Sequence, residues 1–137
     1  MTLPPYRPMK LPQTDNVLAM IEPHRNTIVQ VAQGVIDDWD WNLGGCCGAI
    51  ADEICNTLDE LEGLAAYPHG QDGGEHTWVV LPTKQGIVEV DIPWQIYETR
   101  LGYCRYEPTK MKVCPNDLVV EFVDVDPNEA LDGDWNY

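Results

Sequence analysis

One cysteine of this chain stands where a thiol could act as a nucleophile. Cys47 follows Gly44 and Gly45 and opens a predicted helix. The first turn of a helix lowers the pKa of a thiol, because its free backbone N–H groups and partial positive charge stabilise the thiolate. The two glycines allow a sharp turn into the helix, and Gly48 leaves room for a substrate. We therefore expect Cys47 to be the nucleophile, with the adjacent Cys46 as the alternative.

A nucleophilic thiol also needs a base, and the base needs a group that fixes its orientation. The segment HTWVVL-PTKQ-GIVEVDI, over residues 76–92, is typical of two strands joined by a four-residue hairpin loop. We predict the register in which Leu81 pairs with Gly86. That register places His76 directly opposite Asp91 on one face of the sheet. His76 is therefore the predicted base and Asp91 the residue that orients it.

Acyl transfer further requires hydrogen-bond donors for the oxyanion that forms on the attacked carbonyl group. The backbone N–H of Cys47 is one candidate donor. The second is expected from a side chain in the segment just upstream, where Trp41 and Asn42 are available. Gln33 is a poorer candidate, because it falls inside a predicted helix.

The sequence contains no positive sign of a metal site. Its five cysteines form no Cys-x-x-Cys pair, and its three histidines do not fall at zinc-finger spacing. The segment that begins at Asp124 resembles a calcium-binding loop in part, but Glu129 stands where the turn needs glycine and Trp135 where a bidentate Glu is required. We therefore expect no metal and no cofactor.

The elements that must position these groups follow from the periodicity of the apolar residues. Two segments have helical spacing, residues 28–39 and 47–63. Four have the composition or alternation of strands, residues 76–81, 86–92, 94–106 and 118–125. Three are expected to form an extended arm, a loop and an acidic tail, namely residues 1–15, 64–75 and 126–137. This order predicts a single α+β domain over residues 1–137, with N-terminal helices packed on an antiparallel β-sheet.

The proposed site resembles that of a known superfamily. GCCGAIADEI is similar to the nucleophile segment of papain-like and transglutaminase-like cysteine proteases, in which a glycine lies two residues before the cysteine. HTWVVL resembles their His-bearing strand, with Trp two residues after His, and GIVEVDI the strand that ends in Asp. The resemblance covers residues 44–92, and its order is that of the transglutaminase-like branch. It implies a triad of Cys47, His76 and Asp91 in a peptidase, amidase, deamidase or protein cross-linker.

The charge of the chain restricts its partners. The 23 acidic and 8 basic residues give a net charge of -15 and a pI near 4.2, which argues against direct binding of nucleic acid through phosphates. The acids concentrate in residues 35–76 and 115–137, which contain no Lys or Arg. The apolar stretches are too short for a membrane span, and we identify no secretory signal. A cytoplasmic protein without membrane contact is expected.

The sequence thus predicts a cysteine-dependent hydrolase or acyltransferase that acts on an amide or isopeptide bond of a protein or peptide. Water as acyl acceptor would give a peptidase or deamidase, and an amine would give cross-linking. The alternative is a non-catalytic acidic protein that binds or inhibits a basic or DNA-binding partner as a decoy. A decoy needs its acids on one continuous face, whereas the enzyme needs a cleft around Cys47.

Overall fold

The computed structural model describes residues 11–38, 47–70, 76–92 and 113–132. These residues form helices and one four-stranded antiparallel sheet, so the α+β class predicted from the sequence is confirmed. In the part of the chain so described, no helix combines the length and the apolar composition that a membrane span needs. The strand predicted over residues 94–106 lies outside it.

Three consecutive helical segments run from Thr14 to Asp38. They are α1 (Thr14–Ile21), the 3-10 helix η2 (Glu22–His24) and α2 (Arg25–Asp38). A proline stands in the first turn of η2, where a missing N–H removes no helical hydrogen bond. The helix predicted after that proline is therefore confirmed through Asp38.

The extended arm predicted over residues 1–15 is wrong at its C-terminal end. Thr14 and Asp15 form the first turn of α1. Val17 and Ile21 lie four residues apart on the inner face of this helix and are both fully buried. That spacing is helical, whereas the prolines that precede it favour an extended conformation.

The helix that begins at the candidate nucleophile is α3 (Cys47–Glu62), and its bounds agree with the prediction. Its buried residues Ile50, Ile54 and Leu58 recur every four residues and join the main core. Gly63 follows the helix with φ of 64°, a left-handed conformation that glycine adopts without strain. The helical period and this terminal glycine were both readable in the sequence.

Four strands pair in chain order: β1 (Tyr67–Gly70), β2 (Thr77–Pro82), β3 (Ile87–Asp91) and β4 (Val119–Val123). The last three coincide with predicted strands. β1 falls within the loop predicted over residues 64–75, so that prediction is wrong in part. An edge strand tolerates Pro68, because only one of its sides must supply hydrogen bonds to the sheet.

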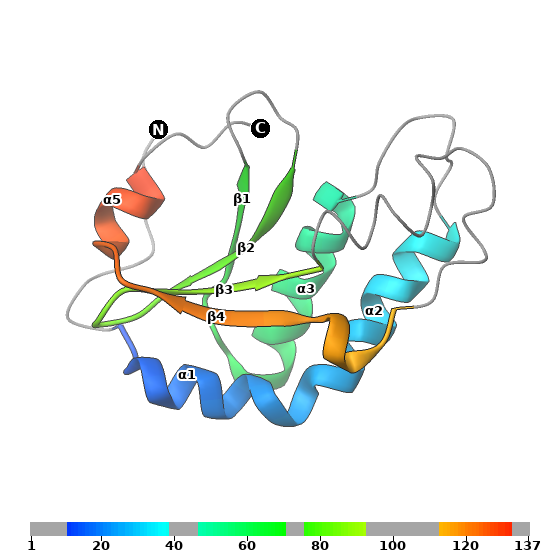
Figure 1. The fold of residues 1–137 in the computed structure, drawn as a ribbon, viewed down its shortest axis with the longest axis horizontal. Helices are drawn as coiled ribbons and strands as arrows, with labels where there is room; N and C mark the ends of the chain where they lie inside the picture. The colour runs from blue at the N-terminus through cyan, green and yellow to red at the C-terminus, as the bar shows by residue number, and fades with distance from the viewer. Residues whose placement is uncertain (1–10, 39–46, 71–75, 93–112, 133–137) are drawn as a thin grey trace.

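Helices α1 and α3 cover one face of the sheet, and α2 packs on α3. In Figure 1, α3 lies alongside β1 and β2, and α1 runs along the lower side of the sheet, where it contacts β3. The strand residues that pack against the helices in the main core alternate along β2 and β3, and they are Val79, Leu81, Val88 and Val90. The side chains between these residues in sequence point to the opposite face of the sheet.

That opposite face has a small apolar cluster at one end and polar groups at the other. Val80 and Ile87 form the cluster, with Ala130 of α5 (Pro127–Asp132) packed against it. The acidic tail predicted over residues 126–137 therefore contains a short helix. By strand alternation, the rest of this face carries aromatic and titratable side chains, namely His69, Trp78, Glu89, Asp91 and Glu121.

The register between β2 and β3 differs from the predicted one by two residues. Leu81 pairs with Val88, and not with Gly86. The turn closes between Thr83 and Gly86, because the Thr83 N–H donates to the Gly86 carbonyl at 2.8 Å and the Thr83 hydroxyl accepts the Gly86 N–H at 3.0 Å. A shift of two residues keeps every side chain on its predicted face. His76 therefore stays on the face of Asp91, as its diagonal neighbour instead of its direct partner.

Gly86→Ala is expected to destabilise the fold by about 1 to 3 kcal/mol. A Cβ at this position would lie 2.5 Å from the carbonyl oxygen of Val123 and 2.8 Å from the ring of Phe122, so backbone must move. Gly34→Ala is the matched control, because nothing lies within 4 Å of its Cβ in α2 and a helix interior gains up to about 1 kcal/mol from alanine. Urea unfolding measures both changes, and a G86A variant as stable as the wild type would contradict the packing described.

Candidate active site

Cys47 is the first residue of α3, and its side chain is partly buried. Burial acts to raise the pKa of the thiol, but hydrogen bonds from His76 and Thr77 and the charge of His76 outweigh it, so the pKa of Cys47 is lowered. The free N–H groups of the helix start act in the same direction. Cys47 is therefore biased towards the thiolate.

His76 lies directly before β2 and is 8% exposed. Its Nε2 is 2.9 Å from Oδ2 of Asp91. Burial acts to lower the pKa of the imidazole, but the hydrogen bonds with Asp91 and Cys47 and the charges of both raise that pKa to about 9. The imidazole therefore favours its protonated form at neutral pH, and its charge lowers the pKa of the Cys47 thiol.

Asp91 ends β3 and has a side chain that is 24% exposed. Burial raises the pKa of its carboxyl, while the hydrogen bond and the charge of His76 and the backbone N–H of Ile92 oppose that rise. Because Oδ2 bonds Nε2 of His76, the imidazole ring is held in one orientation.

The three residues predicted to form the triad are thus brought together from three elements. Cys47 comes from the start of α3, His76 from the residue before β2, and Asp91 from the end of β3. An arrangement of this kind can generate a thiolate, hold its proton on the imidazole and return that proton to a leaving group.

Other predicted site residues cannot be placed in the same way. Cys46, the alternative nucleophile, and the oxyanion candidates Trp41 and Asn42 lie outside the described residues. Gln33 lies in α2, as predicted, and its Oε1 accepts the backbone N–H of Val113 at 2.9 Å. Its side-chain carbonyl therefore serves the packing of α2 against the segment before β4.

The thiols of Cys55 and Cys114 differ from that of Cys47. Cys55 lies two turns further along α3, where burial and the charge of Asp52 raise its pKa to about 12. Cys114 is exposed. These two cysteines therefore supply a partly buried and an exposed reference thiol within the same chain.

Two residues that follow His76 complete its surroundings: Trp78, noted in the sequence as the Trp two residues after His, and Thr77, which was not identified from the sequence. Thr77 follows His76 and points to the opposite, helix-covered face, where its backbone and side chain bond the thiol of Cys47. Trp78 returns to the face of His76, and the two rings stack with centroids 5.7 Å apart. Strand alternation in HTW predicts both positions. Adjacent residues point to opposite faces of the sheet, and residues two apart point to the same face.

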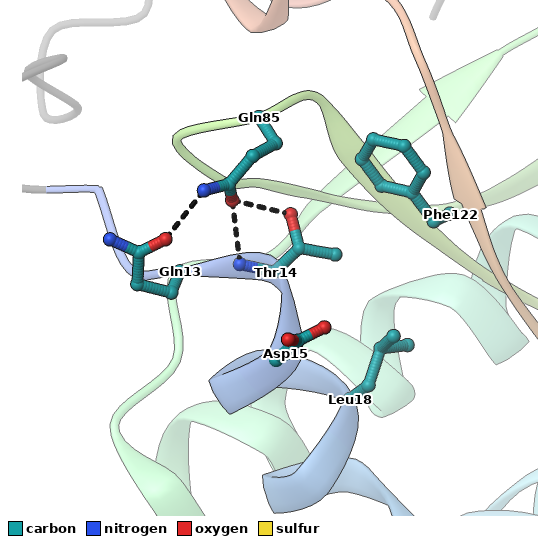
Figure 2. Close-up of a pocket in the computed structure, with 6 residues that line it drawn as sticks. All are labelled: Gln13, Thr14, Asp15, Leu18, Gln85 and Phe122. Carbon is teal, nitrogen blue, oxygen red and sulfur yellow. Dashed lines mark hydrogen bonds between the residues drawn. The ribbon is translucent and has the colours of Figure 1, made fainter.

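A separate cavity of about 350 Å³ lies at the start of α1 and contains none of the triad residues. Figure 2 shows that its polar groups bond one another: Oε1 of Gln85 accepts the Thr14 N–H at 2.9 Å and the Thr14 hydroxyl at 2.8 Å, and the Gln85 amide donates to Gln13. Leu18 and Phe122 supply its apolar walls. These hydrogen bonds fix the β2–β3 turn against the start of α1.

Within the described ranges, no group of three or more His, Cys, Asp or Glu side chains is placed so that it could hold a metal ion.

Comparison with protein-family models, with curated proteins and with solved structures gives no match for this chain.

Proposed function

We propose that this protein is a cysteine-dependent hydrolase or acyltransferase that acts on an amide or isopeptide bond through Cys47, His76 and Asp91. The observation that carries the proposal is the position of His76, which bonds the carboxylate of Asp91 through Nε2 and lies close enough to the helix-start thiol of Cys47 for its charge to lower the pKa of that thiol. A cysteine buried for packing alone would have a raised pKa, as Cys55 has. The papain-like or transglutaminase-like core implied by the sequence is part of the same proposal.

The reaction would proceed in two steps. The Cys47 thiolate attacks the carbonyl carbon, a C–S bond forms, and the tetrahedral oxyanion collapses with cleavage of the C–N bond. The His76 imidazolium gives its proton to the departing amine, and Asp91 keeps the ring oriented through Nε2. The neutral imidazole then takes a proton from water or an amine as it attacks the thioester, and the thiolate departs.

The acceptor in the second step decides the class of product. Water yields a carboxylic acid, so the overall reaction is peptide cleavage or deamidation. A primary amine yields a new amide, so the overall reaction is cross-linking. A partly exposed Asp91 and Trp78 leave the sheet side of the site accessible to such an acceptor.

The first test compares the three described thiols in one sample. At neutral pH, iodoacetamide is expected to alkylate Cys47 faster than the exposed Cys114, and Cys55 slowest, because the thiolate is the reacting species. Peptide mass spectrometry after timed quenching measures each rate, and urea-unfolded protein gives the intrinsic rates as the control. Casein then serves as substrate, with dansylcadaverine as the amine for cross-linking. Untreated protein should cleave casein, deamidate it or attach the amine to it, and alkylated protein should do none of these.

Uniformly slow labelling in the folded protein would contradict this function and favour the acidic decoy. A specific feature supports that second candidate: α3 presents exposed acids and no basic residue, namely Asp52, Glu53, Asp59, Glu60 and Glu62. Such a face would bind a basic protein with an affinity that falls steeply as salt is added.

A further inference from the structure

The triad histidine belongs to a row of rings on the face of the sheet opposite the long helices. The ring of Trp78 stacks on that of His76 with centroids 5.7 Å apart and planes 25° apart. His69 of β1 also contacts Trp78, with centroids 5.1 Å apart and a tilt of 59°. Trp78 is therefore in contact with both histidines.

The indole is itself fixed by a carboxylate. Nε1 of Trp78 donates to Oε2 of Glu89 at 3.1 Å. This bond follows the same diagonal across β2 and β3 as the bond between His76 and Asp91, with each partner two residues along its strand. Two acids of β3, Asp91 and Glu89, thus bond the rings of His76 and Trp78.

Stacking of this kind favours one protonation state of the histidine. The face of an indole ring carries negative electrostatic potential, so it attracts a cation placed over it. The contact therefore stabilises an imidazolium more than it stabilises a neutral imidazole. The gain is larger where water is excluded, and His76 is 8% exposed.

We propose that Trp78 is a positioning residue, which stacks on His76 to stabilise the imidazolium in the orientation that serves Cys47, and that Glu89 holds the indole in place. The inference rests on the proposed function, since it concerns the same histidine. Trp78 is assigned no contact with the reacting atoms, and its effect passes through His76.

Other titratable groups face His76 and act alongside the indole. Cys47 of α3 and Asp91 of β3 bond it, and both raise its pKa. Glu89, Glu121 of β4 and His69 of β1 share the same sheet face. The variants below substitute none of these residues, so the change they report originates at position 78.

The test is the pH dependence of Cys47 alkylation by iodoacetamide, read by mass spectrometry, in wild type, Trp78→Leu and Trp78→Phe. Trp78→Leu should raise the apparent pKa of Cys47 by about 0.5 to 1, which slows alkylation below that pKa by about three- to tenfold. Trp78→Phe keeps an aromatic face but loses the N–H, so about half of that rise is expected. The phenylalanine variant also tests the proposal by itself if the leucine variant fails to fold.

Tyr67→Leu is the matched control. Tyr67 is an aromatic residue of β1 that packs in the same small cluster as Trp78, next to Val80. Its loss should lower the melting temperature without moving the pKa of Cys47. If the Trp78 variants lower the melting temperature alone, Trp78 is structural and the inference is overturned, while the proposed function stands. If wild-type Cys47 itself titrates as an ordinary thiol, both fail.

Discussion

Cys47→Ala is expected to lower turnover of an amide substrate by about 10⁴-fold or more, because no other described thiol can replace the nucleophile. Cys55 has a pKa raised to about 12, and Cys114 is exposed on a different element. The fold should survive, since the change removes one sulfur atom from a partly buried position. Ammonia release, new N-termini and dansylcadaverine incorporation on casein measure the loss in parallel.

The matched controls remove the other thiols. Cys114→Ala should keep wild-type turnover, and Cys47→Ser should lose it, since a hydroxyl has a far higher pKa than a thiol at the same place. Thermal unfolding of each variant separates loss of chemistry from loss of fold. Turnover that persists in Cys47→Ala would exclude this residue as nucleophile and direct attention to Cys46.

The candidate site could be predicted from the sequence because its three residues occupy positions that local patterns define. A helix start is marked by Gly44 and Gly45 before an apolar period, and a hairpin by two β-branched stretches around a polar turn. Side chains alternate between the two faces of a sheet, so a register error of two residues keeps each of them on its predicted face. His76 and Asp91 are therefore in contact although the predicted register was wrong. An error of one residue would have separated them.

The parts that were missed depend on information that short windows do not contain. The register was set by the bonds between Thr83 and Gly86, which move the four-residue loop by one position, from the predicted residues 82–85 to residues 83–86. β1 is stabilised by pairing with β2, and not by its own sequence YPHG. α1 is stabilised by burial of Val17 and Ile21, which offsets its start beside prolines. For β1 and α1, tertiary contacts outweighed local preference.

His76→Ala is expected to slow alkylation of Cys47 at neutral pH on the order of a hundredfold, because each unit of thiol pKa changes the thiolate fraction tenfold. The variant removes the hydrogen bond and the positive charge that lower the pKa of Cys47 and leaves burial, which raises it. Iodoacetamide labelling across pH, with Cys114 as the internal reference, measures the change. A rate within a factor of two of the wild type would show that the thiolate does not depend on the imidazolium.

Asp91→Asn keeps His76 and removes only the negative charge beside it. This variant therefore distinguishes a Cys–His–Asp triad from a Cys–His pair. In the wild type the ion pair exists between the lowered pKa of Cys47 and the pKa of about 9 of His76, so turnover should rise with thiolate formation and fall as the imidazolium loses its proton near pH 9. The asparagine removes the negative charge that raises the pKa of His76, so the alkaline limb should move to lower pH.

A less protonated His76 also stabilises the thiolate less, so the acid limb of the same profile should move to higher pH. The window of activity would therefore narrow from both sides, and turnover at its maximum would fall. A variant that merely loosened the fold would lower the whole profile without shifting its limbs. The movement of the two limbs towards each other is thus the result that assigns Asp91 its part in the reaction.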